Sequence, residues 1–205
     1  MGHSHMYEKI MERPLIYNLW SSIHFLPRFH AIKAAIGQSM HPYILDLGCG
    51  TGLFKKNFPD CDYVGIDNNA QYIDYAGKNL TGHFILGDIL EPEKYLTNQR
   101  FDYIIINSVF HHLNDLSATR LTRNLAAYLN PEGSIIVVDH IYNEKLNYIN
   151  KLLLKYDRGS YSRTEASFRK IFEDFIIVSY HEFFIRAGPL VLWSQCRLVL
   201  KGKNF

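Results

Sequence analysis

The sequence predicts a doubly wound α/β fold, in which a mostly parallel, seven-stranded sheet carries helices on both faces and ends in an antiparallel C-terminal hairpin. The strand-like segments are short and almost continuously apolar, which is typical of strands covered on both faces of a parallel sheet. Segments with helical periodicity alternate with them, and this alternation indicates βαβ units with right-handed crossovers. One turn separates the last two strands, so we expect them to pair with each other at an edge of the sheet.

Five of the strands lie in the central part of the chain. The strongest signals are FDYIIIN at residues 101–107 and SIIVVD at residues 134–139, in which β-branched residues are frequent. Helices are expected over residues 70–80 and 115–129, and the second ends at the helix-terminating run NPEG at residues 130–133. The remaining central strands are expected over residues 43–47, 63–67 and 83–86.

The C-terminal part of the chain changes character after the fifth strand. A helix is expected over residues 144–156, and SRTE at residues 162–165 has the form of a capping box that begins a helix ending near Phe172. The final strands are expected over residues 175–180 and 190–200, and the turn region at residues 186–189 joins them into the edge hairpin.

The composition argues against several classes of protein. The chain has 205 residues, a formal net charge of +2 and no block of five like charges, which gives no indication of a nucleic-acid partner. The three cysteines, Cys49, Cys61 and Cys196, are odd in number and widely spaced, so we expect neither a disulfide framework nor a zinc site. No stretch approaches the roughly 18–20 apolar residues of a membrane span, and we expect a cytoplasmic protein in a reducing compartment.

A glycine-rich loop follows the first predicted strand. Residues 46–52 read DLGCGTG, and Gly48, Gly50 and Gly52 at alternate positions let the backbone turn tightly and approach a ligand without a Cβ in the way. A dinucleotide fingerprint needs its third glycine at position 53, which is Leu53 here. Asp46 lies two residues before the first glycine, and an acid beside the loop suits a ligand with a positive charge and hydroxyl groups rather than a pyrophosphate.

This loop, with the strands that follow it, resembles the class I S-adenosylmethionine-dependent methyltransferases, in particular the broad group that acts on small molecules. The resemblance covers the central half of the chain, residues 43–134, through several motifs in the same order. It implies that S-adenosylmethionine is the cofactor, that Gly48, Gly50 and Gly52 pass beneath it, and that Asp46 helps to organise the loop around its methionine part.

Three further motifs follow, each at the carboxyl end of a predicted strand, where open α/β sheets bind ligands. Asp67, followed by Asn68, ends the second strand, and a carboxylate there accepts hydrogen bonds from both ribose hydroxyls. After the third strand, the resemblance implies that Asp88 meets the adenine amino group while Ile89 packs on the ring. Asn107 ends the fourth strand, in the segment where the family faces cofactor and substrate.

His111 and His112 follow the fourth strand and admit two interpretations. In the first, one of them, with His111 as the candidate catalytic residue, is a general base that deprotonates a substrate hydroxyl, because imidazole titrates near neutral pH. In the second, which the resemblance favours, they shape the cofactor pocket or cap the helix that starts at Asp115. His140 has a similar place after the fifth strand. Asp139 and its neighbours form no acid cluster, so we expect no metal.

The predicted activity is methyl transfer from S-adenosylmethionine to an oxygen, nitrogen or carbon atom of a small molecule by in-line displacement. Such a reaction depends on alignment and exclusion of water and needs no covalent protein intermediate. An RNA or protein methyltransferase and a catalytically silent cofactor-binding protein stay open as alternatives, whereas the missing third glycine disfavours an oxidoreductase. NSVF at residues 107–110 lacks the Pro-Pro-aromatic sequence of adenine and glutamine amino-group methylases, which argues against DNA as the substrate. Nothing in the sequence indicates an oligomeric state.

We expect a single methyltransferase domain over residues 6–205, preceded by a tag remnant at residues 1–5. Its three expected parts are an N-terminal helical cap over residues 6–40, a cofactor-binding core over 41–139, and C-terminal helices with the edge hairpin over 140–205.

Two further segments lie outside the motifs. The aromatic segment at residues 7–29, interrupted by Pro14 and Pro27, is expected to pack on the sheet as a helix, and the resemblance adds a lid over the substrate as a second role. RGSYSR at residues 158–163 is expected to be a solvated loop, with binding of an anionic group as the alternative.

Overall fold

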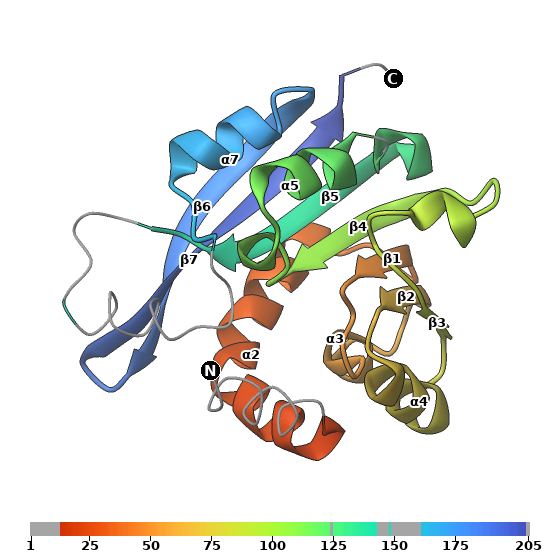
Figure 1. Ribbon diagram of the computed structural model, residues 1–205, viewed down its shortest axis with the longest axis horizontal. Helices are drawn as coiled ribbons and strands as arrows, with labels where there is room; N and C mark the ends of the chain where they lie inside the picture. The colour runs from red at the N-terminus through yellow and green to blue at the C-terminus, as the bar shows by residue number, and fades with distance from the viewer. Residues whose placement is uncertain (1–12, 124, 143–147, 149–160, 204–205) are drawn as a thin grey trace.

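A seven-stranded sheet forms the centre of the computed structural model, with helices packed on both of its faces (Figure 1). The structure describes residues 13–123, 125–142, 148 and 161–203. The strand order is β3-β2-β1-β4-β5-β7-β6, in which β1 to β5 pair in parallel and β7 lies antiparallel between β5 and β6. The predicted fold class, with its hairpin at one edge, is confirmed. The strands are β1 (Tyr43–Leu47), β2 (Asp62–Asp67), β3 (His83–Leu86), β4 (Phe101–Asn107), β5 (Leu129–His140), β6 (Phe175–Ala187) and β7 (Leu190–Gly202).

The helices form one layer on each side of the sheet. Ile105 of β4 packs on one side, whereas its neighbours Ile104 and Ile106 pack on the other, because successive side chains of a strand point to opposite faces. All three side chains are fully buried, which is why the strand is a continuous apolar run in the sequence. One face carries α2 (Pro14–Ile36), α3 (Leu53–Asn57) and α4 (Ala70–Asn79), and the other carries α5 (Asp115–Thr122) and α7 (Glu165–Ile171) (Figure 1).

The two prolines of the N-terminal segment do not interrupt α2, contrary to the prediction. Pro14 is the first residue of the helix, where a missing backbone N–H removes no intrahelical bond. The helix continues across Pro27 to Ile36. Its C-terminal half buries Phe29 and Ile32 against the sheet, and this packing outweighs the cost of a proline inside the helix.

The region between α5 and β5 also differs from the prediction of one helix over residues 115–129. α5 ends at Thr122, whose hydroxyl donates a hydrogen bond to a carbonyl of the preceding turn (3.1 Å), and such back-bonding weakens a helix. A short 3-10 helix, η3 (Leu125–Tyr128), keeps the chain in the core before β5 starts. Residues 130–133 then leave the pairing with β4, and the register between the two strands shifts there. This loop lies where the turn was expected.

The C-terminal elements begin and end at other residues than predicted. Thr164, and not Ser162, is the N-cap of α7, because Arg163 pairs with Ile141 as an extended bridge and delays the start of the helix. β6 and β7 reach 13 residues each and leave only Gly188 and Pro189 for the turn.

Several predictions lie outside the described residues. These are the tag remnant at residues 1–5, the helix over residues 144–156 except for Tyr148, and the first part of the loop at residues 158–163. The division into a cap, a core and a C-terminal part stays a prediction. Within the described ranges, none of the helices combines the length and the apolar character that a membrane crossing requires.

Candidate active site

The glycine loop lies between β1 and α3, at the point where the strand order reverses between β1 and β4. Open α/β sheets bind ligands at such a switch point. Gly48 (φ +82°) and Gly50 (φ +55°) adopt left-handed conformations, and a Cβ on Gly48 would lie only 2.5 Å from the side chain of Val109. Glycine at these positions is therefore a requirement of the backbone path and of the close packing around it.

Asp46 is buried at the end of β1, next to the loop, with 3% of its surface exposed. Its Oδ2 accepts a hydrogen bond from the Tyr63 hydroxyl (2.7 Å), while Oδ1 has no hydrogen-bond partner among the described residues. Burial raises the pKa of Asp46 to about 7; the Tyr63 bond opposes this shift and the charge of Asp67 adds to it. A buried acceptor without a partner destabilises the fold, so Oδ1 fits a positively charged donor that a ligand supplies.

A pocket of about 50 Å³ lies between the glycine loop and α2. Three contacts of α2 close it. The Tyr17 hydroxyl lies 3.1 Å from the place of a Cβ on Gly50, the Thr51 hydroxyl donates to Asn18, and Arg28 donates to Ser108. No site residue was predicted on α2 beyond a general lid role. The pocket is lined by Tyr17, Ser21, Phe25, Arg28, Asp46, Gly48, Cys49, Leu53, Phe54, Asn107 and Ser108.

Asp67, at the end of β2, is hydrogen-bonded to the glycine loop that follows β1. One carboxylate oxygen accepts a hydrogen bond from the Gly50 N–H (2.8 Å), and the other accepts one from the Asn69 N–H (2.9 Å). Burial raises the pKa of Asp67, and these backbone bonds partly offset the shift. Asn68, the next residue in the chain, is exposed. The Asn69 side chain caps α4, because it accepts hydrogen bonds from two backbone N–H groups of this helix.

Asp88 and Ile89 form the turn after β3. Asp88 is exposed and accepts a hydrogen bond from the Leu90 N–H (2.9 Å), while Ile89 is half-buried against the core. The Tyr95 hydroxyl accepts from the Asp88 N–H (3.2 Å), and the Tyr95 ring lies 2.6 Å from the place of a Cβ on Gly87. Tyr95 therefore supports this turn, although no local sequence pattern marks it.

Asn107 ends β4 and lines the pocket together with Asp46. The next residue, Ser108, has a φ of +59°, which turns the chain sharply away from the strand direction. Its backbone N–H donates to the Val138 carbonyl of β5 (2.8 Å). The loop after β4 is thus held across the end of β5.

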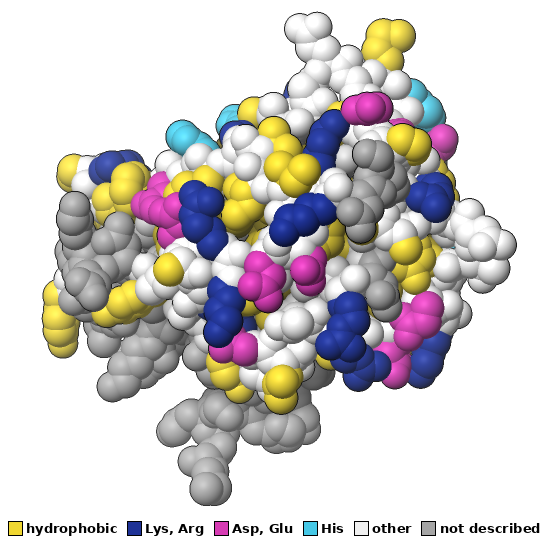
Figure 2. Space-filling model, turned by 90° about the horizontal axis from the view of Figure 1, so that it is seen from above, with side chains coloured by type: hydrophobic (Ala, Val, Ile, Leu, Met, Phe, Trp, Pro, Cys, Tyr) yellow, Lys and Arg dark blue, Asp and Glu magenta, His cyan; other side chains and the backbone are white. Residues whose placement is uncertain are grey.

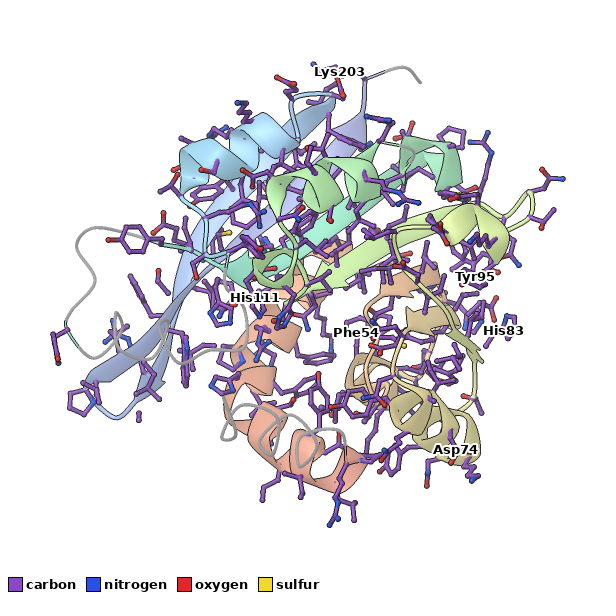
Figure 3. The ribbon with its side chains drawn as sticks, in the orientation of Figure 1. Phe54, Asp74, His83, Tyr95, His111 and Lys203 are labelled. Atoms are coloured by element: carbon purple, nitrogen blue, oxygen red, sulfur yellow. The ribbon has the colours of Figure 1, made fainter. Side chains whose placement is uncertain are left out.

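A buried pair of an acid and an imidazole lies at the ends of β4 and β5. Asp139 is fully buried, and its Oδ1 is 2.6 Å from His111 Nδ1 (Figure 3 labels His111). Its Oδ2 accepts hydrogen bonds from the N–H groups of Val109 and Phe110. Burial raises the pKa of Asp139, but the charge and the hydrogen bond of His111 outweigh it and hold this pKa well below its usual range. Asp139 is therefore an anion that orients the His111 ring.

The structure corrects one interpretation of the histidines. Asn114, and neither His111 nor His112, caps α5, because its side chain accepts a hydrogen bond from a backbone N–H of the first turn (2.8 Å). His112 is exposed, whereas His140 is buried with its ring centroid 4.6 Å from that of His111. No group of three metal-ligating side chains occurs in the part of the chain that the structure describes.

Arg163 does not belong to a solvated loop, contrary to the prediction. It is 5% exposed and donates hydrogen bonds to the Phe110 and Leu113 carbonyls, and it pairs with Asp115 (2.8 Å). Asp139 on one side and Arg163 on the other hold the loop that carries His111. Both contacts join residues that are far apart in the chain, so no sequence pattern could have revealed them.

The fold and the site together define an α/β domain with a glycine loop and a buried carboxylate at the switch point of its sheet. A family model described as a methyltransferase domain matches residues 40–172. The chain belongs to this family, and the predicted class I S-adenosylmethionine-dependent methyltransferase is confirmed.

Two curated relatives show the sequence similarity. The chain is 32% identical over 102 residues to the malonyl-[acyl-carrier protein] O-methyltransferase of Halalkalibacterium halodurans, a match that covers 45% of this chain and 37% of the relative. It is 31% identical over 83 residues to the trans-aconitate 2-methyltransferase of an Acidovorax species, over 38% of this chain and 32% of the relative. The chain therefore spans well under half the length of these relatives.

Solved structures share the fold over most of the chain. A TehB-like S-adenosylmethionine-dependent methyltransferase from Corynebacterium glutamicum has a TM-score of 0.66 at 17% identity, with 98% of both chains covered. The plantazolicin methyltransferase, solved with a monoazolic desmethylPZN analogue and SAH, has a TM-score of 0.64 at 21% identity, with 91% of this chain and 87% of that chain covered. At these identities the likeness shows the fold.

Proposed function

We propose that the chain transfers the methyl group of S-adenosylmethionine to a small-molecule acceptor. The observation that carries this proposal is the buried Asp46 carboxylate, whose Oδ1 has no partner among the described residues, beside a glycine loop at the switch point of the sheet. The ammonium of the cofactor's methionine part is the charged donor that this oxygen fits. Arg28, on the α2 wall of the same pocket, suits the carboxylate of that methionine part.

The proposed site extends along the carboxyl ends of the strands. Asp67 and Asn68 bind the ribose hydroxyls, since a carboxylate oxygen that already accepts one backbone N–H keeps a second lone pair. Asp88 meets the adenine amino group and Ile89 packs on the ring. This assignment is supported by the order of the four residues at the ends of the neighbouring strands β2 and β3, which matches the order of ribose and adenine in the cofactor.

The chain's main task in the reaction is alignment. The bound cofactor supplies an electrophilic methyl group on a sulfonium. Asn107 borders the place of transfer, and α2 covers the loop and excludes water. We assign His111 as the proton acceptor: the Asp139 contact at Nδ1 leaves Nε2 as the basic nitrogen and stabilises the imidazolium that forms when the acceptor loses its proton.

A small-molecule acceptor is supported by the names of two relatives and one solved structure, which are methyltransferases of malonyl-[acyl-carrier protein], trans-aconitate and plantazolicin. On the face shown in Figure 2, basic side chains are interspersed with acidic ones and form no continuous surface of the kind that binds nucleic acid. The three cysteines are unpaired and buried, which fits a reducing, cytoplasmic setting.

Transfer of a labelled methyl group tests the proposal. The full chain is incubated with methyl-labelled S-adenosylmethionine and a bacterial extract that has been separated into small-molecule, RNA and protein fractions. We expect label in the small-molecule fraction with the wild type and none with Asp46→Ala, while Asp60→Ala at an exposed site leaves the transfer intact. Label in the RNA or protein fraction would select the alternative acceptors, and tight cofactor binding without any transfer would select the silent protein.

A further inference from the structure

A group of polar side chains is buried beneath α2, beyond the cofactor pocket. β7 points Trp193, Gln195 and Arg197 toward this helix: the Trp193 ring contacts the His24 ring at 4.1 Å, and Arg197 donates to the Ala31 carbonyl (3.2 Å). Gln195 lies between these two contacts and is fully buried. The core beneath α2 is therefore apolar only in part.

Gln195 has an acceptor atom that the fold does not use. Its Nε2 lies 3.0 Å from His140 Nδ1, on the paired residue of β5, whereas its Oε1 has no hydrogen-bond partner among the described residues. A buried amide oxygen without a donor destabilises the fold relative to an apolar side chain of the same shape. The oxygen therefore fits a hydrogen-bond donor that a ligand supplies.

The same group adjoins the place of methyl transfer. His140 connects Gln195 to the acid–imidazole pair, because its ring centroid lies 4.6 Å from that of His111. On the other side, Arg28 donates both to the His24 carbonyl (3.1 Å) and to Ser108 at the end of β4. A ligand beside Gln195 is therefore separated from His111 only by the His140 ring.

α2 covers both the cofactor loop and Gln195. The pocket beneath it measures about 50 Å³, whereas sites for ligands of this size need roughly 300–1,000 Å³. An outward shift of α2 would open this pocket further to the cofactor. Because His24 and Arg28 belong to the same helix, this shift also uncovers the face that carries Gln195.

We propose that His140 and Gln195 form the acceptor-binding subsite, in which Gln195 Oε1 accepts a hydrogen bond from a hydroxyl or N–H group of the methyl acceptor. This inference rests on the proposed function. It narrows the class of methyl acceptor to molecules that carry a hydrogen-bond donor when they enter the site. The rings of Trp193 and His24 border the subsite and favour a flat apolar body next to the donor.

Phenol and anisole are the probes that test the subsite, since anisole is the same ring with the donor hydrogen replaced by a methyl group. Each is titrated by NMR into the full chain saturated with SAH, the non-reactive form of the cofactor. We expect wild type to bind phenol at least about fivefold more tightly than anisole, the difference that one hydrogen bond of about 1 kcal/mol gives. The Gln195 side-chain amide resonances, identified by their loss in Gln195→Glu, shift with phenol only.

The variants separate a binding role from a structural one. Gln195→Met removes the amide at nearly constant shape and abolishes the preference for phenol, whereas Gln195→Glu keeps an oxygen acceptor and keeps the preference. Gln71→Met, on the exposed surface of α4, changes nothing. All variants keep SAH affinity within about twofold of wild type.

Two results would overturn the subsite: equal binding of phenol and anisole to wild type, or an unchanged preference in Gln195→Met. Failure of wild type to bind SAH at all would instead refute the proposed function.

Discussion

The titration of Asp46 makes cofactor affinity depend on pH. Burial raises the pKa of this carboxyl to about 7, and only its ionised form pairs with the ammonium of the cofactor. About a tenth of Asp46 is ionised near pH 6 and about nine-tenths near pH 8, so the affinity for SAH rises about tenfold across this interval relative to a variant without the carboxyl. Isothermal titration calorimetry at several pH values measures the change directly.

Two variants isolate the contribution of Asp46. The cofactor's own amino group also titrates, with an ordinary α-amino pKa of about 7.7–8.0, and Asp46→Asn retains this effect while it removes the carboxyl. Tyr63→Phe deletes the hydrogen bond that lowers the pKa of Asp46, so the rise in affinity moves to higher pH. A wild-type profile that is identical to that of Asp46→Asn would refute the assignment of Asp46.

The raised pKa of Asp46 also makes the free energy of unfolding depend on pH. The folded-state pKa of Asp46 lies above the unfolded value, so the folded chain binds more protons between the two values. The contribution of Asp46 to stability is complete below the unfolded pKa near 4 and is lost as the pH rises through about 7. Urea unfolding of the cofactor-free chain shows a larger loss in wild type than in Asp46→Asn, which keeps the raised pKa of Asp67.

Three further substitutions test other parts of the site. Asp67→Ala weakens SAH binding by about 10–100-fold, because the ribose hydroxyls lose a charged acceptor that contributes about 1.5–3 kcal/mol; an unchanged calorimetric affinity would contradict this role. His111→Ala lowers kcat by about 100-fold or more at nearly constant SAH affinity, and equal turnover would rule out a base. Arg163→Met lowers Tm by about 5–10 °C, since two buried carbonyls lose their donor at about 2–3 kcal/mol. The exposed Lys170→Met is its control, and an equal Tm in both variants would show that the Arg163 contacts stabilise nothing.

The strands could be predicted because their signal is local. FDYIIIN at residues 101–107 is buried on both faces, and such burial leaves a continuous apolar run in the sequence itself. The glycine loop was found for a similar reason: positive φ angles and close packing confine its positions to glycine. The order of the acids after β1, β2 and β3 then followed from the strand assignment.

Helix ends and tertiary contacts were harder to predict. Ser162 and Thr164 are both acceptable N-caps, and the choice between them depends on the bridge from Arg163 to Ile141, which no local pattern shows. The contact of Asp139 with His111 joins a residue of β5 to the loop after β4, and its effect appears only once the ends of these two strands are adjacent. Contacts of this kind hold most of the candidate site together.

Binding of S-adenosylmethionine by the glycine loop and Asp46 is the basis of the proposed function. Calorimetric titration of the full chain near pH 8 with S-adenosylmethionine, and in parallel with NADH, tests it most directly. We predict saturable binding of one S-adenosylmethionine per chain, a weaker interaction in Asp46→Asn, and no binding of NADH. Binding of NADH in place of S-adenosylmethionine, or an S-adenosylmethionine affinity that does not depend on Asp46, would contradict the account.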